Sequence, residues 1–158
     1  MRKERLSEIL ETAERHVQAK RFRRAASFYR KALALARIGE WEWELAQVRL
    51  ADLHLRKGEL GPAVSHLLRA QEMGSAEPRY DMLLGRTLRL LGKPERASSH
   101  LFDACSSARD RASALLELAQ ATADMGNRRL ARSMVDIVER TDPLNEELRS
   151  ARIYTLDA

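Results

Sequence analysis

The chain is poor in the residue types that mark several protein classes. Its 158 residues include 1 cysteine, 4 prolines and 7 glycines, and 5% are aromatic. A single cysteine, Cys105, cannot close an intramolecular disulfide or build a thiolate metal site, and its isolation fits a reducing compartment. The low glycine and proline content excludes collagen-like and low-complexity chains, and favours a helix-rich globular protein.

Long apolar segments are also missing. The longest uninterrupted apolar run is the five residues Ala32–Ala36, whereas a helix needs roughly 20 to cross a bilayer. The basic first residues, MRKERLSEIL, are not followed by the apolar stretch of a signal peptide. We therefore expect a cytoplasmic protein without a membrane span.

Charge is abundant and unevenly distributed. The net charge is +5, yet residues 1–37 contain eleven Lys or Arg against four Glu, and the remainder contains seventeen against nineteen acidic residues. The excess centres on a basic patch formed by Lys20, Arg21, Arg23 and Arg24. Such a patch suits an acidic partner, a phosphate backbone or an anionic membrane, and the alternative is a solvated turn.

An internal repeat organises the sequence. Gly58, Gly92 and Gly126 are separated by 34 residues each, and Lys20 stands in the corresponding place upstream. Small residues recur seven positions before each glycine and five positions after it: Ala51, Gly85 and Ala119, then Ala63, Ala97 and Ala131. Between these positions apolar residues follow helical spacing, so each unit is predicted to be two helices joined by a tight turn. The small residues are expected where the two helices approach most closely.

This pattern resembles the tetratricopeptide repeat (TPR), a 34-residue helix–turn–helix unit. The segment FRRAASFYRKALAL, residues 22–35, is similar to the second helix of such a unit. The resemblance implies an all-α, right-handed solenoid in one domain, 1–158. Its parts would be repeats at 6–39, 44–77, 78–111 and 112–145, and a capping helix at 146–158. The sequence departs from the family where the conserved tryptophan is replaced by Ile9, Gln47, Asp81 and Leu115.

The resemblance implies that the first helix of each repeat lines a concave groove. The predicted groove has an apolar row (Leu10, Val48, Met82, Leu116), a polar row (Glu14, Asp52, Arg86, Gln120), and in addition Trp41, Leu45 and Arg79. Such a surface suits a peptide or amphipathic helix, and the alternative is that the apolar row is packing between repeats. TPR co-chaperones hold acidic chaperone tails with a five-residue clamp, of which only Arg79 keeps the required charge here, so that clamp is absent.

No catalytic or metal-binding constellation is recognisable. The sequence contains no nucleophile elbow, phosphate-binding loop or H-E-x-x-H motif. His16 and His54 occupy the tyrosine position of the repeat, so interior packing is expected for them, and Trp43 and Cys105 are likewise expected to be packed. We therefore expect no enzyme activity, no cofactor and no metal.

The predicted function is a non-catalytic protein–protein interaction module, acting as adaptor, assembly factor or chaperone. Its partner would be a protein segment held in the groove. Two alternatives remain open: the basic first repeat binds nucleic acid or another polyanion, or the protein self-associates as a scaffold.

Overall fold

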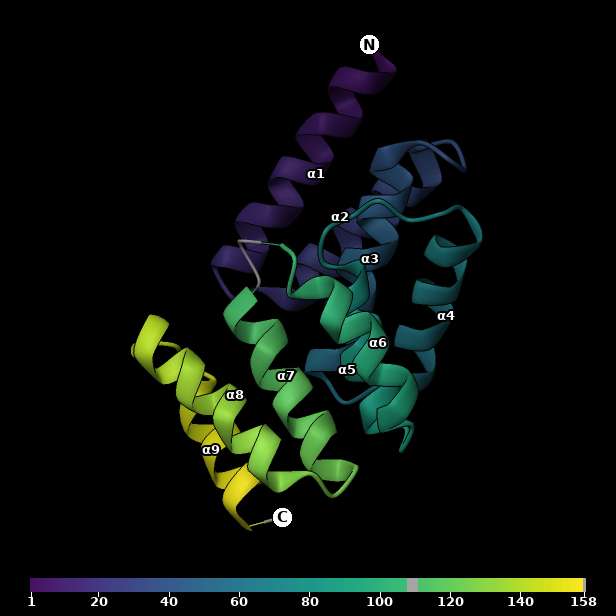
Figure 1. Ribbon diagram of the computed structural model, residues 1–158. Helices are drawn as coiled ribbons and strands as arrows, with labels where there is room; N and C mark the ends of the chain where they lie inside the picture. The colour runs from purple at the N-terminus through teal and green to yellow at the C-terminus, as the bar shows by residue number, and fades with distance from the viewer. Residues whose placement is uncertain (108–110, 158) are drawn as a thin grey trace. The chain divides into compact units, whose positions relative to one another are not determined.

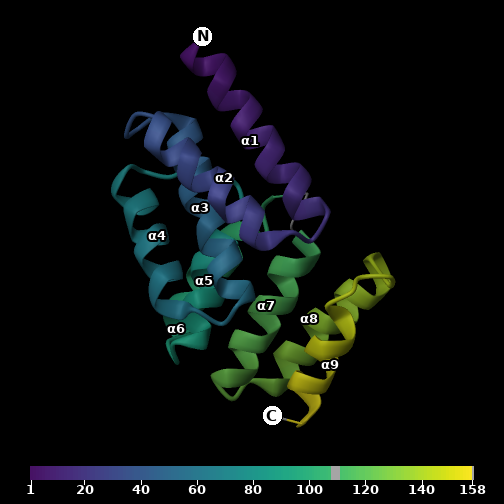
Figure 2. The same ribbon diagram turned by 180° about the vertical axis from the view of Figure 1, so that it is seen from behind.

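The computed structural model describes residues 1–107 and 111–157, and within them the chain is helical (Figures 1 and 2). The helices are α1 (Arg2–Gln18), α2 (Phe22–Leu35), α3 (Trp41–Arg56), α4 (Leu60–Glu72), α5 (Tyr80–Leu90), α6 (Pro94–Ala104), α7 (Arg111–Asp124), α8 (Arg128–Thr141) and α9 (Leu148–Asp157). Residues 108–110, at the end of the third predicted repeat, and Ala158, at the end of the predicted capping helix, lie outside the described residues.

The helices pack in consecutive pairs: α1 with α2, α3 with α4, α5 with α6, and α7 with α8 (Figure 1). This confirms the predicted all-α fold of four helix–turn–helix repeats followed by a terminal helix. The four extra residues between the first two repeats extend the connection that leads into α3, where the Glu40 N–H donates to the Arg37 carbonyl at 3.0 Å.

The pattern of contacts divides the chain into two compact units, Met1–Glu77 and Pro78–Ala158. The first unit contains α1 to α4 and the second contains α5 to α9. The boundary between the units coincides with the boundary predicted between the second and third repeats.

All four repeats use the same turn between their two helices. In each, an N–H just after the turn donates back to a carbonyl five residues earlier, as Arg21 does to His16 at 2.8 Å and Glu59 to His54 at 2.9 Å. The residue before that donor has a positive φ, and Gly58, for example, has φ 74°. Among the described residues, Lys20 is the non-glycine residue with a positive φ, 55°. Lys20 therefore does occupy the glycine position of the first repeat.

The core of the first unit is built from the small and apolar faces of α1, α2 and α3. Its fully or almost fully buried members are Leu6, Leu10, Ala13, Ala25, Ala26, Tyr29, Ala32, Ala46, Leu50 and Leu53. Trp43 is only 8% exposed, which confirms its predicted packing role. On α4, Ala63 and Leu67 are completely buried.

In the second unit, α5 and α6 approach each other at Gly85. A Cβ atom at this position would lie 2.5 Å from Cγ of Leu101 and 3.2 Å from the carbonyl oxygen of Ala97. Carbon atoms in ordinary contact are about 3.5–4.0 Å apart, so no side chain fits there. The close approach predicted for the small residues Gly85 and Ala97 is confirmed.

The helix α9 covers α7 and α8 at the end of the second unit (Figure 1). Ala151 is completely buried, and Leu148 packs against the same core, which contains Leu116 and Val135. Leu156, further along the same helix, is 48% exposed. The turn of α9 that faces the core carries Ala151 and Thr155, and Leu156 lies beyond that face.

Candidate functional site

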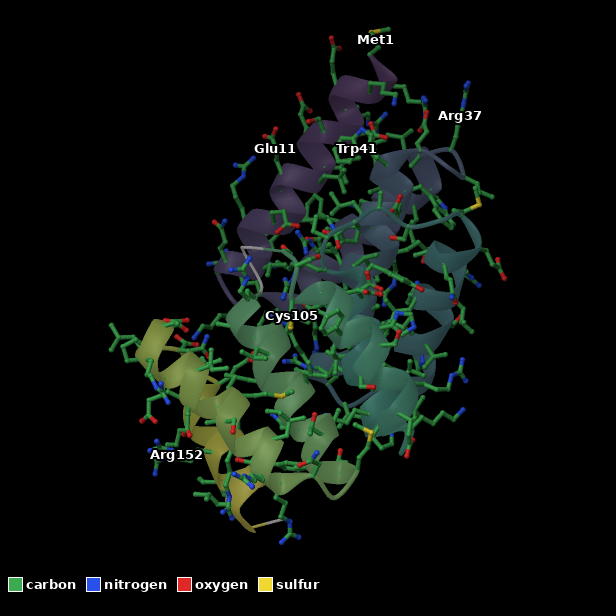
Figure 3. All side chains as sticks on the ribbon, in the orientation of Figure 1. Met1, Glu11, Arg37, Trp41, Cys105 and Arg152 are labelled. Atoms are coloured by element: carbon green, nitrogen blue, oxygen red, sulfur yellow. The ribbon has the colours of Figure 1, made fainter. Side chains whose placement is uncertain are left out.

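A pocket of about 420 Å³ opens between α1 and α3 in the first unit. It is lined by Ser7, Leu10, Glu11, Glu14, Arg15 and Gln18 of α1 and by Trp41 and Leu45 of α3. We call it the α1–α3 pocket, and Figure 3 labels Glu11 and Trp41 on its two helices. Four of the predicted groove residues, Leu10, Glu14, Trp41 and Leu45, thus come together.

Besides Ser7, the remaining lining residues are Glu11, Arg15 and Gln18, and these three were not predicted from the sequence. A signal for two of them exists, because Ser7, Glu11, Glu14 and Gln18 follow one another at spacings of four, three and four. This spacing places them on one face of α1. The face could have been identified by extending the pattern from Glu14 in both directions.

Trp41 is the aromatic residue among the eight that line the pocket, and 61% of its surface is accessible. It stands at the first position of α3, directly after Glu40, whose carboxylate accepts hydrogen bonds from Arg2 at 2.6 and 2.9 Å and from the Arg37 N–H at 3.0 Å. The hydrogen bonds from Arg2 and then from Arg37 lower the pKa of Glu40 to about 2. These bonds tie the start of α3 to α1 and therefore fix Trp41 beside the pocket.

Glu14 joins three helices beside the pocket. Its Oε1 accepts a hydrogen bond from the Tyr29 hydroxyl at 2.7 Å and another from Nε of Arg49 at 2.8 Å. Burial raises the pKa of Tyr29, and the bond to Glu14 raises it further. Glu14, a member of the predicted polar row, is therefore an engaged acceptor that connects α1, α2 and α3.

The predicted apolar row is buried. Leu10 is 4% exposed, Met82 is 2% exposed, and Val48 and Leu116 have no accessible surface. Met82 packs with Ala104 and Ala114, and Leu116 belongs to the core beneath α9. Val48, Met82 and Leu116 fill the interior and do not offer a floor to a partner, so the alternative interpretation as packing describes them. Leu10 also packs in the core, but it lines the α1–α3 pocket as well.

Two members of the predicted polar row are also engaged within the protein. Asp52 is 4% exposed and lies 3.3 Å from Nε of Arg56. Arg86 donates from Nε to Glu117 at 2.6 Å and from Nη2 to Glu147 at 3.3 Å. Arg86 and Asp52, which the sequence placed in the polar row of the predicted groove, therefore serve the packing of their own units instead.

The other two predicted groove residues of the second unit, Arg79 and Gln120, are half-buried. Glu117, the partner of Arg86, was not anticipated. It is 5% exposed and stands between Leu116 and Leu118, and an acidic residue between two core leucines is a signal of a buried ion pair.

The basic patch forms a second pocket of about 680 Å³, which we call the basic pocket. It is lined by Lys20, Arg21, Phe22, Arg23, Arg24 and Lys57. The structure thus brings together all four residues of the predicted basic patch, and adds Lys57 from the α3–α4 turn. In the repeat alignment Gly58 corresponds to Lys20, and Lys57 is the residue directly before Gly58. Lys57 therefore belongs to the turn of the next repeat, and the alignment could have placed Lys57 beside the patch.

The histidines take part in separate polar and ring contacts. His54 lies 2.5 Å from Glu59 and stacks on His66 with 5.4 Å between ring centroids, and Nδ1 of His66 lies 2.6 Å from Oε1 of Gln47. Burial, and then the neighbouring His54, lower the pKa of His66 to about 4. Within residues 1–107 and 111–157, no three His, Cys, Asp or Glu side chains are grouped so as to hold a metal ion.

Burial raises the pKa of the half-buried Cys105 thiol.

None of the helices in the described part of the chain is both long enough and apolar enough to span a membrane. No protein-family model matches the sequence, and no curated protein matches it. Its similarity to known proteins is found among solved structures instead.

YrrB, described as a TPR protein with an unusual peptide-binding site, superimposes with a TM-score of 0.66 at 20% identity, over 94% of this chain and 80% of that one. PilF of Pseudomonas aeruginosa gives a TM-score of 0.77 at 18% identity, over 99% of this chain and 68% of that one. A putative kinesin light chain of Podosopora anserina with nearly identical TPR-like repeats gives a TM-score of 0.67 at 18% identity, over 96% of this chain and 82% of that one. Together with the helix pairs and their common turn, these likenesses show that the chain has the fold of tetratricopeptide-repeat proteins.

Proposed function

We propose that this chain is a non-catalytic protein-interaction module that binds a peptide or amphipathic helix of a partner protein in the α1–α3 pocket. The observation that carries the proposal is Trp41, an aromatic side chain held 61% exposed beside Leu45 at the edge of a pocket. Tryptophan is enriched among the residues that dominate binding energy, because a large rigid ring buries much area at a small entropic cost.

The lining favours a ligand with an apolar anchor. Trp41 and Leu45 supply apolar surface from α3, while the exposed Glu11 and Arg15 supply charges of both signs from α1. A leucine- or phenylalanine-like side chain would contact the tryptophan, and polar flanks would meet the α1 side chains. The shared fold with YrrB, whose description includes a peptide-binding site, supports a peptide ligand. We place the module in the cytoplasm as an adaptor, assembly factor or chaperone.

The experiment is selection of a displayed library of random peptides on the purified protein, followed by affinity measurements on Trp41→Ala. Enriched peptides should share an apolar position, and their affinity should fall at least about tenfold in the variant, as expected for a central aromatic contact. Ile38→Ala is the matched control, because Ile38 is 72% exposed yet does not line the pocket. It should change affinity by less than about twofold.

Two outcomes would contradict the proposal. One is the absence of any enriched peptide, and the other is unchanged affinity in Trp41→Ala while circular dichroism shows both variants folded. Leu45→Glu provides a second variant in the same pocket, and it should also weaken the selected peptides.

A further inference from the structure

The basic pocket is a second surface that shares no lining residue with the α1–α3 pocket. Five of its six lining residues are cationic, and none is acidic. Four of the cations belong to the α1–α2 turn and the start of α2, and Lys57 comes from the turn of the next repeat. Positive charges from two repeats are therefore concentrated around one hollow.

The cations of this pocket are only weakly compensated within the chain. In the part of the chain that the structure describes, none of the five forms an ion pair. Glu59 interacts electrostatically with Lys57, but its carboxylate is bonded to His54. Like charges at short range repel each other. An anionic group from outside the chain would remove this repulsion and gain from the combined field.

Lys20 carries a positive charge at a position where the other three repeats have glycine. Its φ of 55° lies in the left-handed region, which a side chain disfavours, while Gly58, Gly92 and Gly126 adopt φ of 74°, 72° and 87° there without that cost. The turn thus accepts strain in the repeat whose turn lines the basic pocket. This is the pattern expected when the lysine side chain has a role beyond folding.

The surroundings of Phe22 distinguish among possible anions. The guanidinium of Arg56 lies over the Phe22 ring, 5.6 Å from its centroid, so a cation covers one face of the ring that a nucleic-acid base would need for stacking. The rest of the Phe22 ring and the aliphatic stems of the arginines and lysines give the pocket apolar surface, and the charged ends of these side chains surround that surface. Outside residues 1–37 the chain has seventeen cationic and nineteen acidic residues, so the excess of positive charge is confined to the first repeat.

We propose that the basic pocket binds an acidic segment of a partner protein, in which carboxylates pair with Arg21, Arg23 and Arg24 and an adjacent apolar side chain contacts Phe22. Guanidinium groups match carboxylates with two parallel hydrogen bonds, which favours this pairing. The site is independent of the α1–α3 pocket, so failure of either proposal leaves the other standing.

The test uses the full chain and a fluorescein-labelled peptide that has one leucine between two runs of glutamate. The same peptide with glutamine in place of glutamate, an oligothymidylate of equal length and inorganic phosphate are the comparison ligands. The site variant is Arg23→Glu/Arg24→Glu, and the matched control is Arg128→Glu/Arg129→Glu. The control alters net charge equally, at exposed residues that follow the equivalent turn in the fourth repeat and do not line the basic pocket.

We expect the glutamate peptide to bind in a salt-dependent manner, and its affinity to fall at least about tenfold in the site variant but less than about twofold in the control. Lys20→Gly should weaken binding severalfold without lowering the melting temperature, which separates loss of charge from loss of fold. Equal loss in site and control variants, or equal binding of the glutamine peptide, would overturn the proposal. Tighter binding of the oligothymidylate would assign the pocket to nucleic acid, and competition by phosphate alone at the peptide's affinity would assign it to a small anion. Either result would also refute the acidic-segment proposal.

Discussion

Replacing Gly85 by alanine tests the close approach of α5 and α6, because two effects of opposite sign compete there. In an unconstrained helix interior, alanine is favoured over glycine by about 1 kcal/mol. Here the new methyl group would lie 2.5 Å from Cγ and 2.7 Å from Cδ2 of Leu101, roughly 1 Å inside normal contact distance. Leu101 is completely buried, so it cannot turn away into solvent.

Overpacking of this kind costs about 1–3 kcal/mol, which exceeds the gain in helix propensity. We therefore expect Gly85→Ala to lower the free energy of unfolding by about 1 kcal/mol, measured by urea denaturation with far-ultraviolet circular dichroism. Gly61→Ala is the matched control. Gly61 lies in the first turn of α4, and a Cβ there would meet no atom within 4 Å, so this substitution should leave stability unchanged or raise it.

The other repeats supply a compensating change. Where the third repeat pairs Gly85 with Leu101, the fourth pairs Ala119 with the smaller Val135, and both are buried. Leu101→Val should therefore restore part of the stability lost in Gly85→Ala, giving a favourable coupling of about 1 kcal/mol in a double-mutant cycle. A Gly85→Ala variant more stable than the parent, or strict additivity in the cycle, would refute the argument from close approach.

Three further predictions concern backbone strain and titration. Lys20→Gly should raise the free energy of unfolding by about 0.5–1 kcal/mol, seen as a higher urea midpoint, because relief of the left-handed conformation outweighs the extra freedom of the unfolded chain; a lower midpoint would contradict the strain. The pKa of Glu40 is lowered from 4.5 to about 2 in the folded protein. The ionised carboxylate therefore stabilises the fold at pH values above 4.5, and this stabilisation is lost as pH falls from 4.5 towards 2. Acid unfolding curves of Glu40→Gln should accordingly be flatter than those of the parent in that window, and identical slopes would count against the Arg2–Glu40 pair. The pKa of His66, lowered from 6.5 to about 4, favours its neutral form in the folded state, so stability should decline as pH falls from 6.5 to 4. Thermal melts of His66→Gln, which can still donate to Gln47, should lose this part of the decline, and an unchanged pH profile would exclude it.

The repeat architecture was predictable because it depends on local chemistry. Glycines 34 residues apart mark turns that need a positive φ, and Gly58, Gly92 and Gly126 adopt it. The helical spacing of apolar residues between the turns then places small residues where paired helices touch, as at Gly85. These features require only the conformational preferences of each segment, and no information about the rest of the chain.

The candidate sites were predictable in part. Leu10, Glu14, Trp41 and Leu45, which helical spacing had assigned to the predicted groove, line one pocket. The same reasoning did not reveal that Glu14 is engaged by Arg49 and Tyr29, which lie 35 and 15 residues away in the sequence. Periodicity assigns a residue to a face, but it does not state which side chain from another helix lies opposite.

By itself, then, the sequence determined the pairing of helices into repeats, the turns within the repeats, and the concentration of positive charge around Lys20. Only the tertiary structure decided that Met82 and Leu116 are interior while Trp41 remains exposed, and that Arg86 is neutralised by Glu117 and Glu147, 31 and 61 residues away. The physical reason is that exposure and charge pairing depend on the distances between helices. Those distances are set by packing between segments far apart in the chain.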